Sequence, residues 1–216
     1  MRVFDLREDP DASLDAVVDH IRGGGLVAYP TETVYGIGGA CTPAAADRVR
    51  ALKGRGETKP LIALVPELKA VEALEWTPDA EELAKIFWPG SVTLVLRDPD
   101  GLFPDGVRDA ERGTVGVRVS PHPIASRLVA ELGEPLTSTS LNRSGEAPIT
   151  TGADARTWLE GLEATDVWLI DGGTLPPSAP STVVDCTRRR PRVLREGAIP
   201  TGRLRCAIPE IDGSDD

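Results

Sequence analysis

Several residue types that carry chemistry are scarce in this chain of 216 residues. It has three cysteines, Cys41, Cys186 and Cys206, and their wide spacing fits neither a disulfide framework nor a zinc motif. We therefore expect free thiols. Of the two histidines, His20 lies in a helix-like stretch and His122 lies between two prolines, which disfavours a histidine-based metal site or catalytic triad. These scarcities argue against cysteine and histidine chemistry and predict no metal site built by the protein.

The chain also lacks a long apolar run and an excess of positive charge. No apolar stretch approaches the roughly 20 residues that span a bilayer. The first nine residues turn acidic before a signal-peptide core could form, so we expect a cytoplasmic protein. With 24 basic and 34 acidic residues, the net charge of −10 argues against a surface that binds nucleic acid throughout. A local basic pocket remains compatible with this charge.

Apolar periodicity and turn residues predict strands that alternate with helices, which is typical of an α/β fold. No repeat or linker divides the chain, so we expect a single domain over residues 1–208. The acidic segment 209–216 is predicted to be a disordered tail, and Pro200-Thr201-Gly202 is expected to interrupt regular structure. The predicted helices are 13–22, 42–52, 66–74, 78–87, 121–132 and 153–162; the predicted strands are 26–29, 61–65, 92–96, 114–119, 136–140, 167–170, 182–184 and 192–194.

Two polar segments follow these elements, and neither contains a standard nucleotide-binding motif. Residues 29–38 place Glu32 between two threonines, before glycines that permit close backbone approach. An ordinary turn explains that pattern equally well. In the second segment, Lys53, Arg55 and Lys59 could converge on a polyphosphate, or they could form the solvated end of a helix.

A third segment, residues 137–145, surrounds Asn142 with five hydroxyl side chains. Asn142 is the only asparagine, and there is no glutamine. A hydroxyl-rich turn and a site that needs the paired donor and acceptor of an amide are both compatible with this pattern. On the strand 114–119, residues Thr114, Gly116 and Arg118 share one face because side chains alternate along a strand.

The order of these segments resembles the YrdC-like family of L-threonylcarbamoyl-AMP synthases over about residues 10–200. The K-x-R half of the family's hallmark tetrad falls on Lys53 and Arg55, and the S-x-N half falls on Ser140 and Asn142. Matching segments are Y-P-T-E-T-V-Y-G from residue 29, W-P-G from residue 88, V-G-V-R from residue 115 and S-T-V-V-D from residue 181.

This resemblance implies an α/β fold, namely a twisted, open, mixed sheet with flanking helices around a large, positively charged cavity. It also implies the condensation of L-threonine, bicarbonate and ATP, with Mg²⁺, to threonylcarbamoyl-AMP and pyrophosphate. The product would serve a downstream threonylcarbamoyl-transferase complex that modifies tRNA, and tRNA itself is a further expected partner. The implied catalytic residues are the tetrad Lys53, Arg55, Ser140 and Asn142; the implied ATP-binding residues are the tetrad with Lys59, Thr114 and Arg195; the implied threonine-binding residues are Thr33, Arg118, Ser138 and Ser181.

The chain departs from the family pattern at two positions. Leu141 replaces the common alanine, and Leu64 replaces a histidine that contacts threonine in many relatives. Two alternative functions are compatible with a protein of this fold. One is a module that binds double-stranded RNA or tRNA, for which Arg188–Arg190 would add a basic patch. The other is a carbamoyl-transfer domain of the hydrogenase-maturation type.

Overall fold

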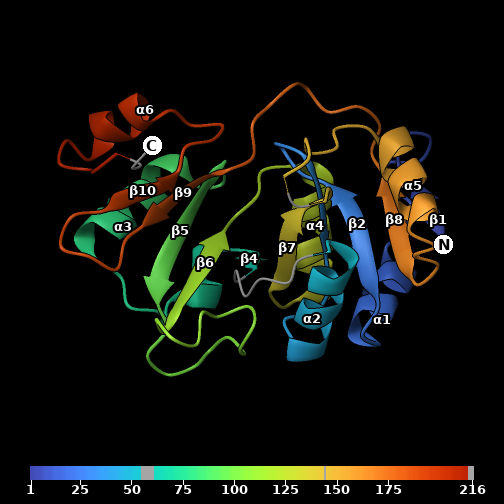
Figure 1. The fold of residues 1–216 in the computed structure, drawn as a ribbon, viewed down its shortest axis with the longest axis horizontal. Helices are drawn as coiled ribbons and strands as arrows, with labels where there is room; N and C mark the ends of the chain where they lie inside the picture. Colours follow the sequence, from blue (N-terminus) through green and yellow to red (C-terminus); the bar gives the residue numbers. More distant parts are fainter. Residues whose placement is uncertain (55–60, 144, 214–216) are drawn as a thin grey trace.

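The computed structural model describes residues 1–54, 61–143 and 145–213. Within them the chain folds around a mixed sheet of ten strands in the order β1-β8-β2-β3-β7-β4-β6-β5-β9-β10 (Figure 1). Four strand pairs are parallel, namely β1/β8, β2/β8, β4/β6 and β5/β9, and the others are antiparallel. The predicted mixed α/β fold is confirmed.

The strands are β1 (Val3–Asp5), β2 (Leu26–Pro30), β3 (Tyr35–Gly38), β4 (Ile62–Leu64), β5 (Val92–Arg97), β6 (Thr114–Arg118), β7 (Leu136–Ser140), β8 (Val167–Asp171), β9 (Thr182–Asp185) and β10 (Arg192–Arg195). The helices are α1 (Asp15–Arg22), α2 (Pro43–Leu52), the 3-10 helix η1 (Leu68–Val71), α3 (Pro78–Phe87), α4 (Pro123–Leu132), α5 (Gly152–Gly161) and α6 (Thr201–Ala207). The termini lie at opposite ends of the molecule, and the segment from β8 to β9 runs along one edge between the two ends (Figure 1).

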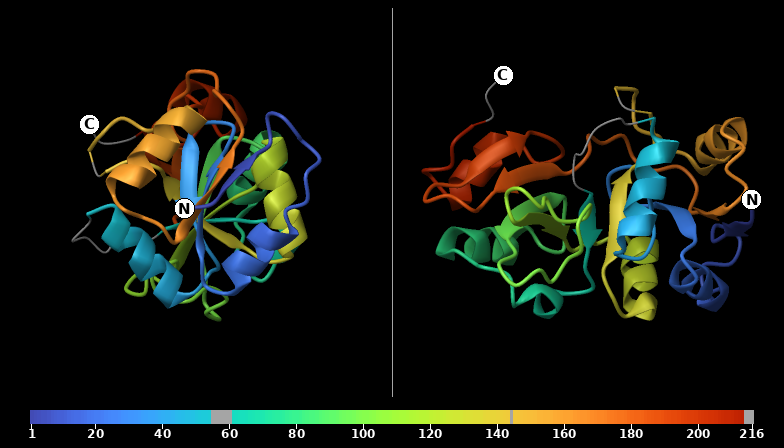
Figure 2. Two further views of the ribbon diagram at one scale, coloured as in Figure 1. Left: turned by 90° about the vertical axis from the view of Figure 1, so that its right-hand side faces the viewer. Right: turned by 60° about the horizontal axis from the view of Figure 1, so that its bottom comes forward.

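Strand β2 shows how the sheet is covered on both faces. All five of its residues are buried. Val27 and Tyr29 belong to one apolar cluster with α1 and α4, whereas Leu26 and Ala28 belong to a second cluster with α2 and α5. Figure 2 shows these two helix pairs on opposite sides of the sheet. A strand buried on both faces reads as a continuous apolar run, as residues 26–29 do.

Threonine caps explain why several helices begin where the sequence predicts. The side chains of Thr42, Thr77 and Thr151 accept hydrogen bonds from backbone N–H groups in the first turns of α2, α3 and α5. Proline occupies the first turn of both α2 and α3, where its missing N–H has no cost.

Replacing Thr77 with alanine should lower the free energy of unfolding by about 1 kcal/mol, because the Ala80 N–H loses its 3.2 Å partner. Urea unfolding followed by circular dichroism measures this change. Thr77→Ser keeps the hydroxyl and should stay close to the wild type. Equal losses for both variants would show that the methyl group, and not the cap, stabilises α3.

The structure corrects two predicted elements. Within the helix expected over 66–74, the structure has the short 3-10 helix η1 (Leu68–Val71). It is followed by an i→i+3 hydrogen bond from Leu74 N to the Val71 carbonyl, and both side chains are buried. Residues 35–38, for which the sequence predicts no strand, form β3 between β2 and β7. Gly38 permits this pairing, because a Cβ there would lie 1.6 Å from the Thr137 carbonyl oxygen.

Both ends of the chain contain more structure than the sequence indicates. Strand β1 pairs with β8, and α6 begins directly after Pro200 and buries Leu204 against α3. The structure describes residues 209–213 of the segment expected to be a disordered tail. Ile211 is buried, and the Asp212 carbonyl accepts a 2.9 Å hydrogen bond from Val193 N. A single apolar residue among acids has no period to detect, which is why the sequence does not reveal this packing.

Candidate functional site

A cavity of about 580 Å³ lies over the middle of the sheet. This volume falls within the roughly 300–1,000 Å³ range of small-molecule sites. Its charged lining consists of Arg112, Arg118, Arg195 and Asp109, which is an excess of positive charge among the described residues. The cavity is also lined by seven residues that the sequence analysis assigns to substrates: Thr33 in the β2–β3 turn, Thr114 and Arg118 on β6, Ser138 and Ser140 on β7, Ser181 before β9, and Arg195 on β10.

The amine of Lys53 lies beside the cavity in a dense hydrogen-bonding cluster. Lys53 caps the C-terminus of α2 and is only 1% exposed. Its Nζ donates to the Ser140 carbonyl, to Thr139 Oγ1 at 3.2 Å and to Asn142 Oδ1 at 3.2 Å. The structure therefore brings three members of the predicted tetrad together. Arg55 and Lys59 lie outside the described residues.

Asn142 uses both ends of its amide in this cluster. Its Oδ1 also accepts a 2.6 Å hydrogen bond from Ser140 Oγ, while its Nδ2 donates to the Glu146 carbonyl at 2.7 Å. Asn142 is 7% exposed, so an unpaired amide group would be costly there. The need for a donor and an acceptor on one side chain is thus met by the chain's sole asparagine.

The loop between β5 and β6 contacts residues on both sides of the K-x-R segment. The Gly106 carbonyl accepts from Arg50 Nη2 at 2.5 Å and from Leu61 N at 3.3 Å. Gly106 has a φ of +94°, a conformation that favours glycine. Arg50 is therefore an anchor of this loop, although the sequence indicates only an ordinary helical position.

At the other side of the cavity, Arg118 forms a buried ion pair with Glu32. Ser120 Oγ donates to Glu32 Oε2 at 2.6 Å, and Ser91 Oγ donates to Oε1 at 3.2 Å. Glu32 is part of the polar segment 29–38 but is not among the site residues predicted from the sequence. The signal was Arg118 itself, because an arginine inside a buried strand requires a counter-charge.

The residues assigned to the two substrates meet at Ser181. Arg195 Nη2 donates to the Ser181 carbonyl at 2.7 Å and lies 3.4 Å from Ser181 Oγ, which is 3.0 Å from Thr93 Oγ1. Ser181 was assigned to threonine and Arg195 to ATP. Their direct contact places the two predicted subsites next to each other.

The two tyrosines of the 29–38 segment are structural. Burial raises the pKa of Tyr29 and raises that of Tyr35 to about 12, so both phenols stay neutral near pH 7. Tyr35 Oη donates to the Gly173 carbonyl at 2.8 Å and accepts from Gly172 N at 3.1 Å, which fixes the start of the β8–β9 connection.

The two family departures are both core residues. Leu64 is fully buried in the α1–α4 cluster and pairs with Arg118 across β4 and β6. Leu141 is fully buried in the other cluster. Leu64 therefore places an apolar side chain beside Arg118 at the position where many relatives have a histidine.

The remaining groups that could carry chemistry are the three cysteines and any cluster of side chains that could bind a metal ion. The three cysteines are free, and burial raises the pKa of Cys41 to about 12. Among the described residues, no three His, Cys, Asp or Glu side chains are grouped so that they could hold a metal ion. None of the helices in the described part of the chain has the length and apolar character needed to cross a membrane.

Comparison with known proteins gives a consistent result. Residues 19–197 match the model of the Sua5/YciO/YrdC family, which carries the description "Telomere recombination". A Pyrococcus abyssi protein named threonylcarbamoyl-AMP synthase is 38% identical over 195 residues, covering 88% of this chain and 56% of its own length. A Chromohalobacter salexigens protein of the same name is 37% identical over 185 residues, covering 83% of this chain and 95% of its own.

Among solved structures, the chain resembles the crystal structure of Pyrococcus abyssi Sua5 complexed with L-threonine. The TM-score is 0.86 with 32% sequence identity, and the match covers 99% of this chain. The chain spans 62% of the length of that Sua5 chain.

Proposed function

The chain belongs to the Sua5/YciO/YrdC family, and we therefore propose that it is a threonylcarbamoyl-AMP synthase. The resemblance noted from the sequence is confirmed. The reaction joins L-threonine, bicarbonate and ATP, and it releases threonylcarbamoyl-AMP, pyrophosphate and water. The activated product then passes its threonylcarbamoyl group to tRNA through a downstream transferase complex.

The chemical step needs positioning more than a protein nucleophile. The threonine amine takes up the carboxyl carbon of bicarbonate to form a carbamate, with loss of water. A carbamate oxygen then attacks the α-phosphorus of ATP, a P–O bond forms, and the bond to pyrophosphate breaks. Both reactants are anions, so fixed cations and hydrogen-bond donors must offset their repulsion. Mg²⁺ enters with ATP, whose phosphate oxygens are the ligands it prefers.

The cluster around Lys53 is the proposed site for the phosphates. Lys53 supplies a positive charge that is shielded from water, and the Ser140 carbonyl and Asn142 Oδ1 hold its amine beside the cavity that Ser140 lines. Arg55 and Lys59 are proposed to contribute further cations, while Thr114 and Arg195 contact the nucleotide from β6 and β10. Screening by water is weak in such a cavity, which increases the effect of each charge.

The threonine subsite is proposed to lie between Thr33, Arg118, Ser138 and Ser181. Arg118 offers a forked donor to the carboxylate of the amino acid. The three hydroxyls can accept from or donate to its amino and side-chain groups. Because Ser181 contacts Arg195, a threonine held there would lie beside the nucleotide.

One observation carries the proposal: Lys53 Nζ and Asn142 Oδ1, from two distant segments of the predicted tetrad, are 3.2 Å apart and lie beside a cavity lined by seven of the other predicted substrate residues. We expect pyrophosphate release from ATP to require both L-threonine and bicarbonate. A coupled pyrophosphate assay that omits each substrate in turn measures this. Equal release with glycine or serine would contradict the proposed substrate, and tRNA binding without pyrophosphate release would favour the RNA-binding alternative.

A further inference from the structure

Three side chains from two separate segments of the chain donate to the carboxylate of Glu32. Arg118 donates from the end of β6, Ser120 donates from the residues that follow, and Ser91 donates from the turn before β5. Glu32 itself lies in the β2–β3 turn. The W-P-G segment, to which the proposed function gives no task, directly precedes Ser91.

The backbone around this carboxylate is also tied together. Gly90 N donates to the Val119 carbonyl at 2.9 Å, so the turn that bears Ser91 is bonded to the strand end that bears Arg118 and Ser120. On the other side of β6, Val65 N donates to the Arg118 carbonyl at 2.9 Å. These bonds fix the backbone positions from which the three donors reach Glu32.

Burial of the Arg118–Glu32 ion pair is not expected to stabilise the fold by itself. The side chains of Arg118 and Glu32 are 4% and 13% exposed. Desolvating two charges often costs more than their attraction returns, and apolar replacements of similar size can be more stable. Arg118 Nε is also buried and has no hydrogen-bond partner among the described residues. The guanidinium is thus fixed at Nη1 by Glu32, while a second donor of the same planar group is unused.

We infer that Glu32 is a positioning residue that orients the Arg118 guanidinium toward the carboxylate of the amino-acid substrate, with Ser91 and Ser120 fixing Glu32 in turn. The inference rests on the proposed function. A planar fork recognises a carboxylate only in a defined orientation, so the residue that sets this orientation sets the affinity. Glu32 acts through Arg118 and does not touch the reacting atoms.

The main test compares the Glu32→Gln and wild-type proteins by calorimetric titration with L-threonine and, separately, with ATP. Glutamine keeps the shape but replaces one acceptor oxygen by a donor, which opposes the donors of Arg118 and the two serines. We expect the threonine Kd to rise by about ten- to a hundredfold and the ATP Kd to change by less than about twofold. Glu131→Gln is the matched control, because Glu131 pairs with Arg127 on the surface of α4.

A double-mutant cycle separates positioning from a general structural role. In an Arg118→Ala background, Glu32→Gln should change the threonine Kd by less than about twofold, because the group it orients is gone. A full effect of Glu32→Gln in that background would overturn the inference. So would an unchanged threonine Kd in the single variant, or equal losses of threonine and ATP affinity in a folded protein.

If Glu32→Gln does not fold, Ser120→Ala and Ser91→Ala test the same inference, since each removes one donor to Glu32. Each should raise the threonine Kd by about three- to tenfold without changing ATP binding. Unchanged threonine affinity in both would overturn the inference, as would a wild-type protein that binds no threonine. Threonine binding by the wild type without pyrophosphate release would instead overturn the proposed function alone.

Discussion

Replacing Lys53 with methionine should lower ATP affinity and the rate of pyrophosphate release by about a hundred- to a thousandfold. Methionine has a similar length but carries no charge and no donor. Each charge-assisted contact to a phosphate contributes roughly 1.5–3 kcal/mol. The Lys53 amine can make two of them if phosphate oxygens replace Thr139 Oγ1 and Asn142 Oδ1 as its acceptors. A loss of about 3–4 kcal/mol corresponds to the expected factor. Calorimetric ATP titration and the pyrophosphate assay measure the two effects.

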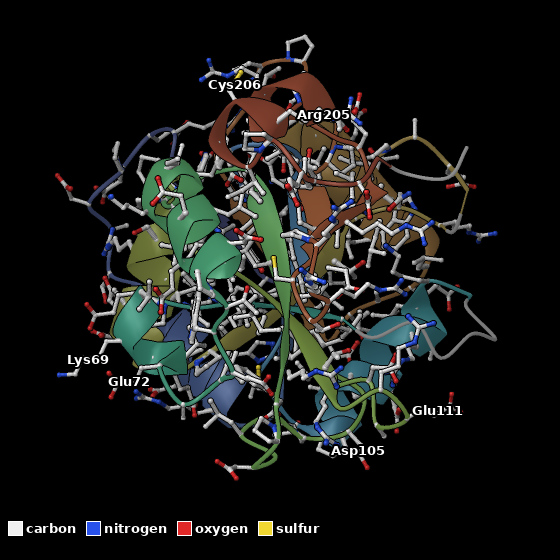
Figure 3. The ribbon with its side chains drawn as sticks, turned by 90° about the vertical axis from the view of Figure 1, so that its left-hand side faces the viewer. Lys69, Glu72, Asp105, Glu111, Arg205 and Cys206 are labelled. Atoms are coloured by element: carbon white, nitrogen blue, oxygen red, sulfur yellow. The ribbon has the colours of Figure 1, made fainter. Side chains whose placement is uncertain are left out.

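Stability must be followed in the same variant, because Lys53 also bonds the protein. Its removal takes a donor away from the Ser140 carbonyl and from Asn142 Oδ1, which accepts a second bond from Ser140 Oγ. Loss of this donor costs about 1–3 kcal/mol, partly offset because a buried charge is removed. Lys69→Met is the control, since Lys69 lies on η1 at the outer rim of the molecule (Figure 3). A folded Lys53→Met protein with normal ATP affinity would exclude Lys53 from the nucleotide site.

Changing Asn142 to aspartate should weaken ATP binding more than changing it to alanine. Aspartate has nearly the shape of asparagine, but it places a negative charge about where Oδ1 accepts from Lys53 Nζ at 3.2 Å. The new charge compensates that of Lys53 and repels the phosphates. Two unit negative charges, one on the aspartate and one on a phosphate, repel each other by roughly 3 kcal/mol at a separation of about 6 Å and an effective dielectric constant of about 20. This repulsion corresponds to about a hundredfold increase in the Kd for ATP.

The aspartate also loses the donor that bonds the Glu146 carbonyl and sets two oxygens against each other there. Asn142→Ala loses the same bond without adding charge, so it isolates the electrostatic part. ATP titrations of both variants at low and high salt make the comparison, with a smaller gap expected at high salt. Equal ATP affinity for the two variants would mean that no phosphate lies near residue 142.

The loop between β5 and β6 shows why the choice of control residues depends on the structure. From the sequence, Arg50 is a neutral comparison for the K-x-R segment, because it lies on the preceding helix. In the structure it bonds the Gly106 carbonyl, which also accepts from Leu61 N beyond that segment. In contrast, Asp105 and Glu111 of the same loop lie at its outer rim (Figure 3). They are better positions for neutral substitutions.

The sequence by itself determined two kinds of feature: local structure, which depends on neighbouring residues, and family membership, which depends on the order of the motifs. Threonine followed by proline predicted the starts of α2 and α3, since caps involve residues within one turn. The apolar run at 26–29 predicted β2. The order of the polar segments predicted the family, and the alternation along β6 placed Thr114 and Arg118 on one face, where both line the cavity.

Only the tertiary structure decided which distant groups meet. Strand β3 forms because its backbone pairs with β2 on one side and with β7 on the other, although its glycines disfavour a strand. Ile211 is buried because β10 and α6 provide a surface for it. The partner of Arg118 could not be read from the sequence, since Glu32 is 86 residues away. Hydrogen bonds and ion pairs act over a few ångströms in space, so their partners are selected by the strand order of the sheet and not by distance along the chain.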